Sequence, residues 1–307
     1  MKIYNNFNLK KKHKGSIILI GNFDGVHLGH RKLFNLAKRY KKKFKLNVGV
    51  ITFEPMPKMY FSKKLKNFRI ANIKQKIRIF EKIGVDFLII KKFNKIFSKI
   101  KSQNFIKNII YEKLKAKYIF VSNNFRFGNK REGDVNQLKR NEIKYDYQII
   151  KPKPFKVKNK IISSTLIRKL LINGKLKIAN RLLGRNWRIE GIVEKGRQMG
   201  KKIGFPTCNI DIKDYVLAKP GVYAVRIYKK NKKNPFKGIA NLGYRPTFAQ
   251  KKILLEVHIF NFYGNLYNKP LTIEFINFIR KETKFKNVED LKKQINRDLK
   301  IAKKILK

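Results

Sequence analysis

A single cysteine, Cys208, is present among the 307 residues of the sequence. One thiol cannot form an intramolecular disulfide, and it excludes a zinc site built from several cysteines. The first apolar run, 16–20, is too short for the core of a signal peptide or for a membrane span. We therefore expect a cytoplasmic protein without membrane contacts.

Acidic residues are also few: 19 Asp and Glu stand against 76 Lys and Arg, which gives a net charge of +57. A strongly basic chain is typical of proteins that bind nucleic acid. Here the basic residues are spread along the whole chain and accompany abundant Asn, Ile and Phe, which A- and T-rich codons encode. We attribute most of the charge to compositional drift, since a solvated lysine contributes little to stability. A nucleic-acid partner is not expected, although a basic nucleic-acid-binding protein on an enzyme scaffold stays an alternative.

Apolar residues make up 43% of the chain, which is enough to build packed cores. Between residues 16 and 150, short β-branched runs alternate with amphipathic stretches of helical period. This alternation predicts βα units around a doubly wound parallel sheet, and hence an α/β fold. The predicted strands are 17–20, 47–53, 86–90, 118–121 and 145–149. The predicted helices begin near Val26, Asn72, Ser102 and Asp134.

The second half of the chain follows a different pattern. Residues 151–160 contain two prolines and five lysines and are predicted to form an exposed connection without a strand. A pair of helices, 164–172 and 175–183, is predicted to follow, because Asn173-Gly174 and Gly184 are helix stop signals. Five short alternating strands then predict a small antiparallel β-barrel domain, closed by a C-terminal helix from Val288. These strands are 187–194, 222–228, 237–242, 253–260 and 271–280. We therefore predict two domains, 1–183 and 184–307.

The glycine-rich segment 21–30, GNFDGVHLGH, directly follows the first predicted strand of the sheet. A turn from strand to helix at this edge presents backbone N–H groups and a helix N-terminus, which stabilise phosphate. His27 and His30 share one face of the first helical turn and could reach the same phosphoryl oxygen. The alternatives are that a histidine only caps or packs against the helix, or that the pair binds a metal.

A cluster of hydroxyl groups, Ser163, Ser164 and Thr165, stands at the start of a predicted helix. Arg168 follows one turn later. Hydroxyls, helix N–H groups and a guanidinium together suit a triphosphate. The alternative is a simple helix cap beside a solvated arginine.

A second glycine-rich and basic segment, 196–209, contains a hydroxyl and an amide two residues apart. On a strand, Thr207 and Asn209 point to the same side, and two neutral oxygen ligands can hold Mg²⁺ together with phosphate and water. The alternative is an ordinary turn. Downstream, Glu256 is a lone carboxylate on an otherwise apolar strand, with His258 on the same face. A carboxylate in such a position is costly without a function or a partner, and the alternative partner is Arg245.

Several of these segments resemble those of the prokaryotic bifunctional riboflavin kinase/FMN adenylyltransferase (FAD synthetase) family. GNFDGVHLGH is similar to the family's version of the His-x-Gly-His signature of nucleotidyltransferases. The likeness extends over about 16–299, in the family's order. The other matching segments are TFEPMP at 52–57, NFRFG at 124–128, ISSTLIR at 162–168, GKKIGFPTCN at 200–209, GIANLGYRPTF at 238–248, LEVHIF at 255–260 and RKETKF at 280–285.

The resemblance implies ATP-dependent phosphorylation of riboflavin to FMN, followed by adenylylation of FMN to FAD with release of pyrophosphate. It implies Mg²⁺ as cofactor, ATP as co-substrate, and flavins and adenine nucleotides as small-molecule ligands. Glu256 corresponds to the base that accepts the proton of the riboflavin 5'-hydroxyl. His27, His30 and Arg168 correspond to catalytic residues of adenylylation.

The resemblance also implies three groups of binding residues. Those for ATP and phosphate are Gly21, Phe23, Asp24, Gly25, Gly29, Ser163, Ser164, Thr165, Gly196, Lys201, Gly204, Phe205 and Pro206. Those for flavin are Asn124, Phe125, Phe127 and Arg245. Those for the metal are Thr207 and Asn209.

Some positions depart from the family pattern. Ser122 replaces a common glycine and Asn124 a frequent acidic residue, so a kinase with a decayed adenylyltransferase module is a further alternative. Lys201 replaces an arginine, and so the charge is kept but the planar guanidinium group is absent. Cys208 replaces a small packed residue and is not expected to be a catalytic thiol, because no histidine base is indicated nearby. The oligomeric state stays open.

Overall fold

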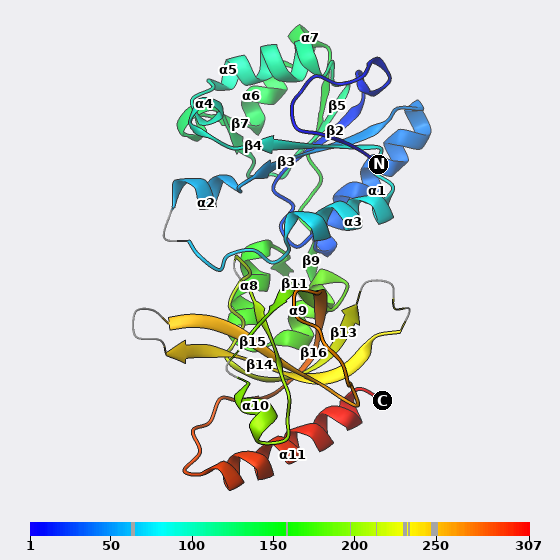
Figure 1. Cartoon of the computed structure of the whole chain (residues 1–307). Helices are drawn as coiled ribbons and strands as arrows, with labels where there is room; N and C mark the ends of the chain where they lie inside the picture. Colours follow the sequence, from blue (N-terminus) through cyan, green and yellow to red (C-terminus); the bar gives the residue numbers. More distant parts are fainter. Residues whose placement is uncertain are drawn as a thin grey trace. The chain divides into compact units, whose positions relative to one another are not determined.

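The computed structural model describes residues 1–62, 65–157, 159–196, 198–212, 214–229, 232, 234–246 and 251–307, with the backbone alone at 245, 246, 251 and 252. The chain forms two compact units (Figure 1). The first comprises Met1–Leu65 and Ile73–Ser163, and the second comprises Lys66–Asn72 and Ser164–Lys307. No helix in the described part of the chain combines the length and apolar character needed to cross a bilayer.

The first unit is built on a six-stranded parallel sheet with the order β1-β4-β3-β2-β5-β8. Consecutive strands run outward from β2 to β4, and the chain then returns to the other side of β2. This confirms the predicted doubly wound parallel sheet. The strands are β1 Lys2–Tyr4, β2 Ile17–Ile20, β3 Val48–Glu54, β4 Phe87–Lys92, β5 Tyr118–Phe120 and β8 Gln148–Ile150.

Helices cover both faces of this sheet (Figure 1). Two turns of 3-10 helix, η1 Lys11–His13 and η3 Asn129–Arg131, and a two-strand ribbon, β6 Arg126–Phe127 with β7 Gly133–Asp134, complete the unit. The helices are α1 Leu28–Phe44, α2 Pro57–Phe61, α3 Ile73–Ile83, α4 Lys95–Ser98, α5 Ser102–Asn104, the π-helix η2 Phe105–Lys113, α6 Val135–Arg140 and α7 Glu142–Tyr145.

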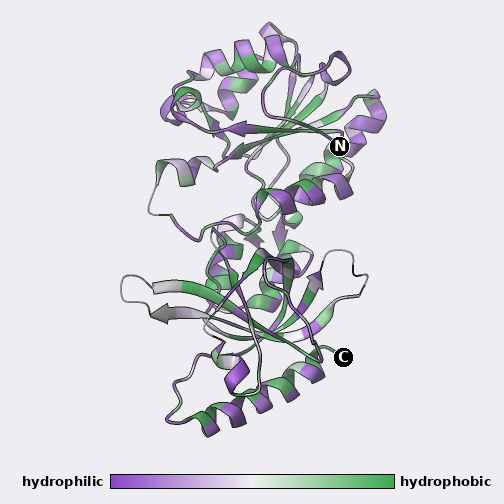
Figure 2. Ribbon diagram, in the orientation of Figure 1, coloured by the Kyte–Doolittle hydropathy of each residue, from purple (hydrophilic) through white to green (hydrophobic). Residues whose placement is uncertain are grey.

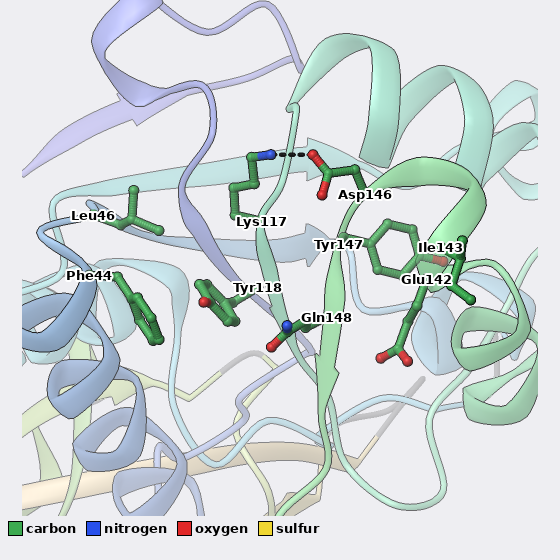
Figure 3. Close-up of a pocket in the computed structure, with 9 residues that line it drawn as sticks. All are labelled: Phe44, Leu46, Lys117, Tyr118, Glu142, Ile143, Asp146, Tyr147 and Gln148. Atoms are coloured by element: carbon green, nitrogen blue, oxygen red, sulfur yellow. Dashed lines mark hydrogen bonds and ion pairs between the residues drawn. The ribbon is translucent and has the colours of Figure 1, made fainter.

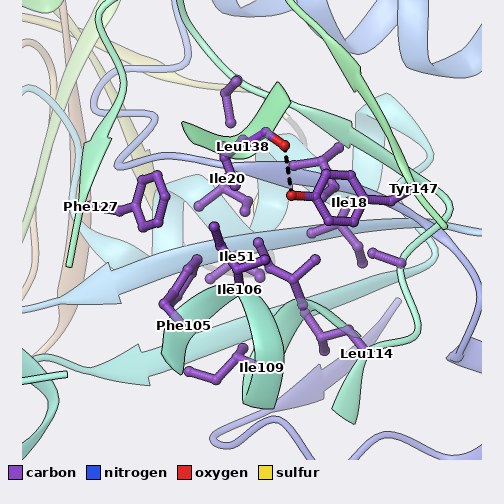
Figure 4. Packing of buried hydrophobic residues seen from close by; sticks show 14 of the residues in the cluster. Ile18, Ile20, Ile51, Phe105, Ile106, Ile109, Leu114, Phe127, Leu138 and Tyr147 are labelled. Carbon is purple, nitrogen blue, oxygen red and sulfur yellow. Dashed lines mark hydrogen bonds between the residues drawn. The ribbon is translucent and has the colours of Figure 1, made fainter. Parts of the chain in front are cut away.

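Alternation along the strands divides the apolar side chains between two cores. In β2, Ile17 and Leu19 face one core, which α1 and α3 complete with Phe34 and Phe80. Ile18 and Ile20 face the other core, which also contains residues of η2, α6 and α7 (Figure 4). Because both of their faces are buried, the central strands β2 and β3 are apolar almost throughout (Figure 2).

Three local details differ from the prediction. Strand β1 was not predicted, because a three-residue strand carries no periodic signal, yet it pairs in parallel with β4. The strand predicted from residue 145 begins at Gln148, because Tyr145 ends α7. The connection 151–160 is not free of strands: β9 Lys156–Val157 pairs with β10 Lys160–Ile161 as a short hairpin.

The second unit contains a closed antiparallel barrel with the order β11-β12-β15-β14-β13-β16 and the C-terminal helix α11. This confirms the predicted barrel with a closing helix, but the prediction gave five strands and did not include β12. The predicted helix pair is also present. The elements are α8 Ser164–Ile172, α9 Leu176–Leu183, β11 Trp187–Glu194, α10 Met199–Lys202, β12 Cys208–Asp211, β13 Gly221–Lys229, β14 Phe236–Pro246, β15 Lys251–Ile259, β16 Pro270–Lys281 and α11 Val288–Ile305.

The compact units divide the chain at Ser163, whereas the predicted domains divide it at Leu183. Helices α8 and α9 belong to the second unit because α9 is bonded to the barrel. The buried Asn180 accepts a hydrogen bond from Trp187 N at 2.8 Å and donates to Phe275 O at 3.0 Å. A boundary between functional modules at Leu183 stays a prediction.

A short segment from the first half of the chain, 66–72, also packs within the second unit. Arg69 N donates to Asp214 O at 2.8 Å, and Arg69 O accepts from Val216 N at 2.7 Å. The indole Nε1 of Trp187 donates to Ile70 O at 2.9 Å. Local sequence patterns do not reveal such a segment, because its partners lie more than a hundred residues away.

We expect Asn180→Ala to lower the free energy of unfolding by about 2 kcal/mol, because it leaves Trp187 N and Phe275 O buried without these partners. Trp187 is the only tryptophan and is buried, so its fluorescence during denaturant unfolding reports on this unit. Asn186→Ala is the matched control, since Asn186 shares only one hydrogen bond with Asn180. An equal or larger loss in the control would contradict the assignment.

Candidate functional sites

The first candidate site is the turn between β2 and α1. It follows the strand at which the order of the sheet reverses, since β2 pairs with β3 on one side and β5 on the other. Such a position is where open α/β sheets bind ligands. Phe23 and Val26 adopt left-handed backbone angles, with φ of 47° and 40°, and Gly25 has φ of 77°. Asp24, between them, is buried.

Both predicted histidines lie at the start of α1 on one face. His27 is the N-cap residue, and its Nδ1 accepts from His30 N at 3.4 Å. The two imidazole rings stack with centroids 3.6 Å apart. A Cβ on Gly29 would lie 3.2 Å from the His27 ring, so glycine leaves room for this arrangement. His27 therefore caps helix α1, as one of the alternatives held, and the capping hydrogen bond orients its ring beside the ring of His30.

The sequence did not reveal Lys76, which lies on α3 and is 1% exposed. Its Nζ donates to Asn22 O at 3.1 Å and to Thr52 Oγ1 at 3.2 Å. Asn22 belongs to the glycine-rich turn, and Thr52 begins the TFEPMP segment. A buried ammonium group thus joins the two motifs, and no local pattern could have indicated this contact.

The predicted flavin-side loop lies around β6. Phe127 is buried in the core of the unit, and Phe125 stacks on it with ring centroids 5.6 Å apart. Asn124 is exposed, and its Oδ1 accepts from Ser122 Oγ at 3.1 Å. The two positions that depart from the family pattern therefore contact each other.

The hydroxyl cluster is divided between the two compact units. Ser163 ends the first unit, while Ser164 and Thr165 form the first turn of α8 in the second. Arg168, one turn later, donates from Nε to Phe68 O at 2.8 Å. Its guanidinium carbon lies 3.7 Å from the centroid of the Phe68 ring. Arg168 is thus held by the segment 66–72 and is not a freely solvated side chain.

The second candidate site is a cavity of about 430 Å³ in the second unit. Backbone register places Glu256 of β15 between Asn209 of β12 and Asn241 of β14. All three side chains line the cavity, together with Thr207 and His258. The structure thus brings together the predicted base and both predicted metal ligands.

Glycines shape the same cavity. A Cβ on Gly196 would lie 1.5 Å from Asn209 Nδ2, and one on Gly200 would lie 2.4 Å from Phe205 O. Gly204 has φ of 92°, where glycine is favoured. Phe205 lines the cavity and Pro206 O bonds to His258 Nδ1 at 2.8 Å, whereas Lys201 is exposed on α10.

Several cavity residues were given no role from the sequence, although Asn241 and residues 280–285 lie in segments that resemble the family. Asn241 could have been found from the strand register opposite Glu256. Others come from the end of β16, the following turn and α11, and their positions depend on tertiary packing. They include Arg280, Glu282, Thr283, Phe285, Leu291, Ile295 and Asp298.

Two further predictions concern neighbouring residues. Cys208 is buried, and burial raises the pKa of its thiol to about 11, which agrees with a packing role. In β14, Arg245 pairs with Lys252, four residues from the position opposite Glu256. The side chain of Arg245 lies outside the described residues.

Another cavity, of about 680 Å³, lies beside β5, β8 and α7 in the first unit (Figure 3). Its lining includes Phe44, Tyr118 and Ile143, and an ion pair between Lys117 and Asp146. None of the residues singled out from the sequence lines it. In contrast, the smaller cavity in the second unit is lined by the predicted Thr207, Asn209 and Glu256.

Comparisons with known proteins agree on both halves of the chain. A family model for FAD synthetase matches residues 9–166, and one for riboflavin kinase matches residues 183–306. A bifunctional riboflavin kinase/FMN adenylyltransferase from Buchnera aphidicola (Schizaphis graminum) is 41% identical, over 97% of this chain and 96% of its own. The Escherichia coli K12 protein of the same name is 36% identical, over 93% and 91%.

A solved structure has the same fold over nearly the whole chain. A crystal structure from Streptococcus pneumoniae, described as a macrolide-efflux protein, has a TM-score of 0.85 and 27% identity, with 98% of both chains covered. The two matched models and the full-length relatives show that the chain belongs to the bifunctional riboflavin kinase/FMN adenylyltransferase family.

Proposed function

We propose that the chain phosphorylates riboflavin to FMN in the barrel cavity and adenylylates FMN to FAD at the glycine-rich turn, with ATP as co-substrate in both reactions. The observation that carries the proposal is the row formed by Asn209, Glu256 and Asn241 on three adjacent strands. Location in the cytoplasm is part of the proposal and rests on the reducing environment that a single cysteine indicates.

In the kinase reaction, Glu256 accepts the proton of the riboflavin 5'-hydroxyl while the oxygen attacks the γ-phosphorus of ATP and ADP leaves. The glycines at 196, 200 and 204 let the backbone approach the nucleotide phosphates closely. His258 lies on the same face as Glu256, and its hydrogen bond to Pro206 O holds the glycine-rich segment against β15.

The cavity suits a magnesium ion. Asn209 is 6% exposed, and its Oδ1 has no hydrogen-bond partner among the described residues. A buried amide oxygen without a partner is costly, and a cation would satisfy it. Asn209 and Thr207 would hold Mg²⁺, which supplies positive charge to the transferring phosphoryl group.

In the adenylylation, an oxygen of the FMN phosphate attacks the α-phosphorus of ATP, and pyrophosphate leaves. His27 and His30, at the start of α1 in the first unit, stabilise the negative charge that develops. The resemblance to the family gives the same role to Ser164, Thr165 and Arg168 of α8. The stacked, capped histidines and the anchored Arg168 support this assignment, because rigid donors lose little entropy on binding.

Glu256→Gln should lower the rate of FMN formation from riboflavin by about 10²–10⁴-fold, because an amide cannot accept the proton. Conversion of supplied FMN to FAD should stay within about twofold of the parent protein, since the change leaves the first unit untouched. Chromatography of the products with riboflavin or FMN as substrate measures both rates. Retention of the kinase activity would refute the role of Glu256.

Arg168→Ala should give the opposite pattern and lower FAD formation by about 10²–10³-fold, because one charge-stabilising donor is lost. FMN formation should be unaffected. Lys169→Ala, at the adjacent exposed position of α8, is the matched control and should leave both rates unchanged. FMN without FAD from the parent protein would instead support a kinase with a decayed adenylyltransferase module.

Asn209→Ala should raise the Mg²⁺ concentration that half-saturates the kinase by about tenfold or more, because one ligand is removed. The Mg²⁺ requirement of the adenylylation in the same protein is the internal control and should not change. A kinase that is equally impaired at every Mg²⁺ concentration would argue against metal binding by Asn209.

A further inference from the structure

Helix α11 forms one wall of the kinase cavity through Leu291, Ile295 and Asp298. Its C-terminal half is anchored on the barrel, where Ala302 and Leu306 are fully buried with Val222 and Ala224. In the N-terminal half, Ile295 packs against the same cluster but is only partly buried, residues 288–290 are exposed, and Leu291 lines the cavity. Apolar packing therefore holds this part of the wall less firmly than the C-terminal half.

An ion pair between Asp298 and Arg280 also attaches α11 to the barrel. Asp298 is 1% exposed, and its Oδ1 and Oδ2 accept from Arg280 Nε at 3.0 and 2.9 Å. Arg280 Nη2 lies 2.9 Å from Oδ2, and Gln294 Nε2 donates to Oδ1 at 2.9 Å. Arg280 also donates from Nη1 to Lys281 O at 3.0 Å. Its Nη1 also donates to Thr283 Oγ1 at 3.4 Å, so one arginine joins β16, the following turn and the middle of α11.

The place of this pair in the cavity identifies the substrate that it affects. In the proposed reaction, Thr207, Asn209 and the glycine-rich segment bind the metal and the phosphates and so take up one side of Glu256. Riboflavin must reach Glu256 from the other side, because its hydroxyl and the γ-phosphate meet there. Leu291 and Ile295 belong to the apolar part of the lining, together with Val222, Ile239 and Phe285, and the flavin ring is the apolar group that this part suits.

We propose that Asp298 is a positioning residue of the kinase, whose ion pair with Arg280 holds the N-terminal half of α11 where it forms the riboflavin-binding wall. The proposal rests on the assignment of this cavity as the kinase site. A bidentate pair suits this task, because its geometry fixes direction as well as distance. Removal of the charge from Asp298 leaves Arg280 without its counter-ion and releases the wall.

Asp298→Asn tests the proposal, because it keeps the size of the side chain. We expect the KM for riboflavin to rise by about tenfold or more, with the KM for ATP and the kcat within about threefold. A titration that follows riboflavin fluorescence measures the dissociation constant for riboflavin, which should rise by a similar factor. Arg280→Lys keeps the charge but loses the fork, and should raise the riboflavin KM by a smaller factor.

Glu274→Gln is the matched control. Glu274 lies on the same strand, is 4% exposed, and accepts from Arg188 Nε at 2.8 Å and Nη2 at 2.6 Å, but it does not line the cavity. It should leave both KM values within about twofold at temperatures where the variant is folded. Trp187 fluorescence verifies folding of each variant.

The proposal is overturned if Asp298→Asn and Glu274→Gln raise the riboflavin KM equally, or if Asp298→Asn changes the KM for ATP as much as that for riboflavin. If Asp298→Asn does not fold, an unchanged riboflavin KM in Arg280→Lys overturns it. The assignment of this cavity as the kinase site is refuted by a different result, full kinase activity in Glu256→Gln. The two hypotheses are therefore tested by different variants.

Discussion

The register of β12, β15 and β14 is the constraint on which the barrel site depends. It places Asn209, Glu256 and Asn241 side by side across three strands. The same alternation buries Leu255 and Val257, both 0% exposed, on the opposite side of β15. Because a slip of one residue would exchange these faces, the packing of the core and the placement of the polar row are fixed together. A closed barrel strengthens this constraint, since no strand has a free edge along which to shift.

Charge imposes the next constraint. The chain has only 19 acidic residues, yet Asp298 and Glu274 are almost fully buried, and each is paired with an arginine. Loss of Asp298 would leave Arg280, whose side chain is 21% exposed, without its partner, which is more costly than loss of a surface acid. Arg188 is 40% exposed, so water can compensate for the loss of Glu274 more easily. The excess of lysine is tolerated where water and salt screen it, and this accords with compositional drift as the source of the basic charge.

Local sequence signals predicted the main strands and helices of both units, but they missed short strands such as β1 and β12 and the contacts between distant segments. Helix 164–172 and strand 187–194 were located to the residue, because stop signals and strict alternation mark them. The same register logic grouped Thr207 and Asn209 with each other, and the structure adds Glu256. In contrast, Lys76 and the Arg280–Asp298 pair were missed. Their function depends on which elements pack together, and an isolated lysine or aspartate on an amphipathic helix is indistinguishable from a solvated one.

Glycine has a second function at both sites, beyond the close approach of backbone to phosphate. Gly29 leaves space beside the ring of His27, and Gly196 leaves space for the amide of Asn209, where a Cβ would lie 1.5 Å from Nδ2. In each case a polar side chain is oriented by backbone that passes directly beside it. Orientation by backbone is rigid, and it does not depend on flexible neighbours such as surface lysines. A chain that accumulates lysine at exposed positions can therefore keep both sites preorganised, because neither relies on the side chains that drift changes most easily.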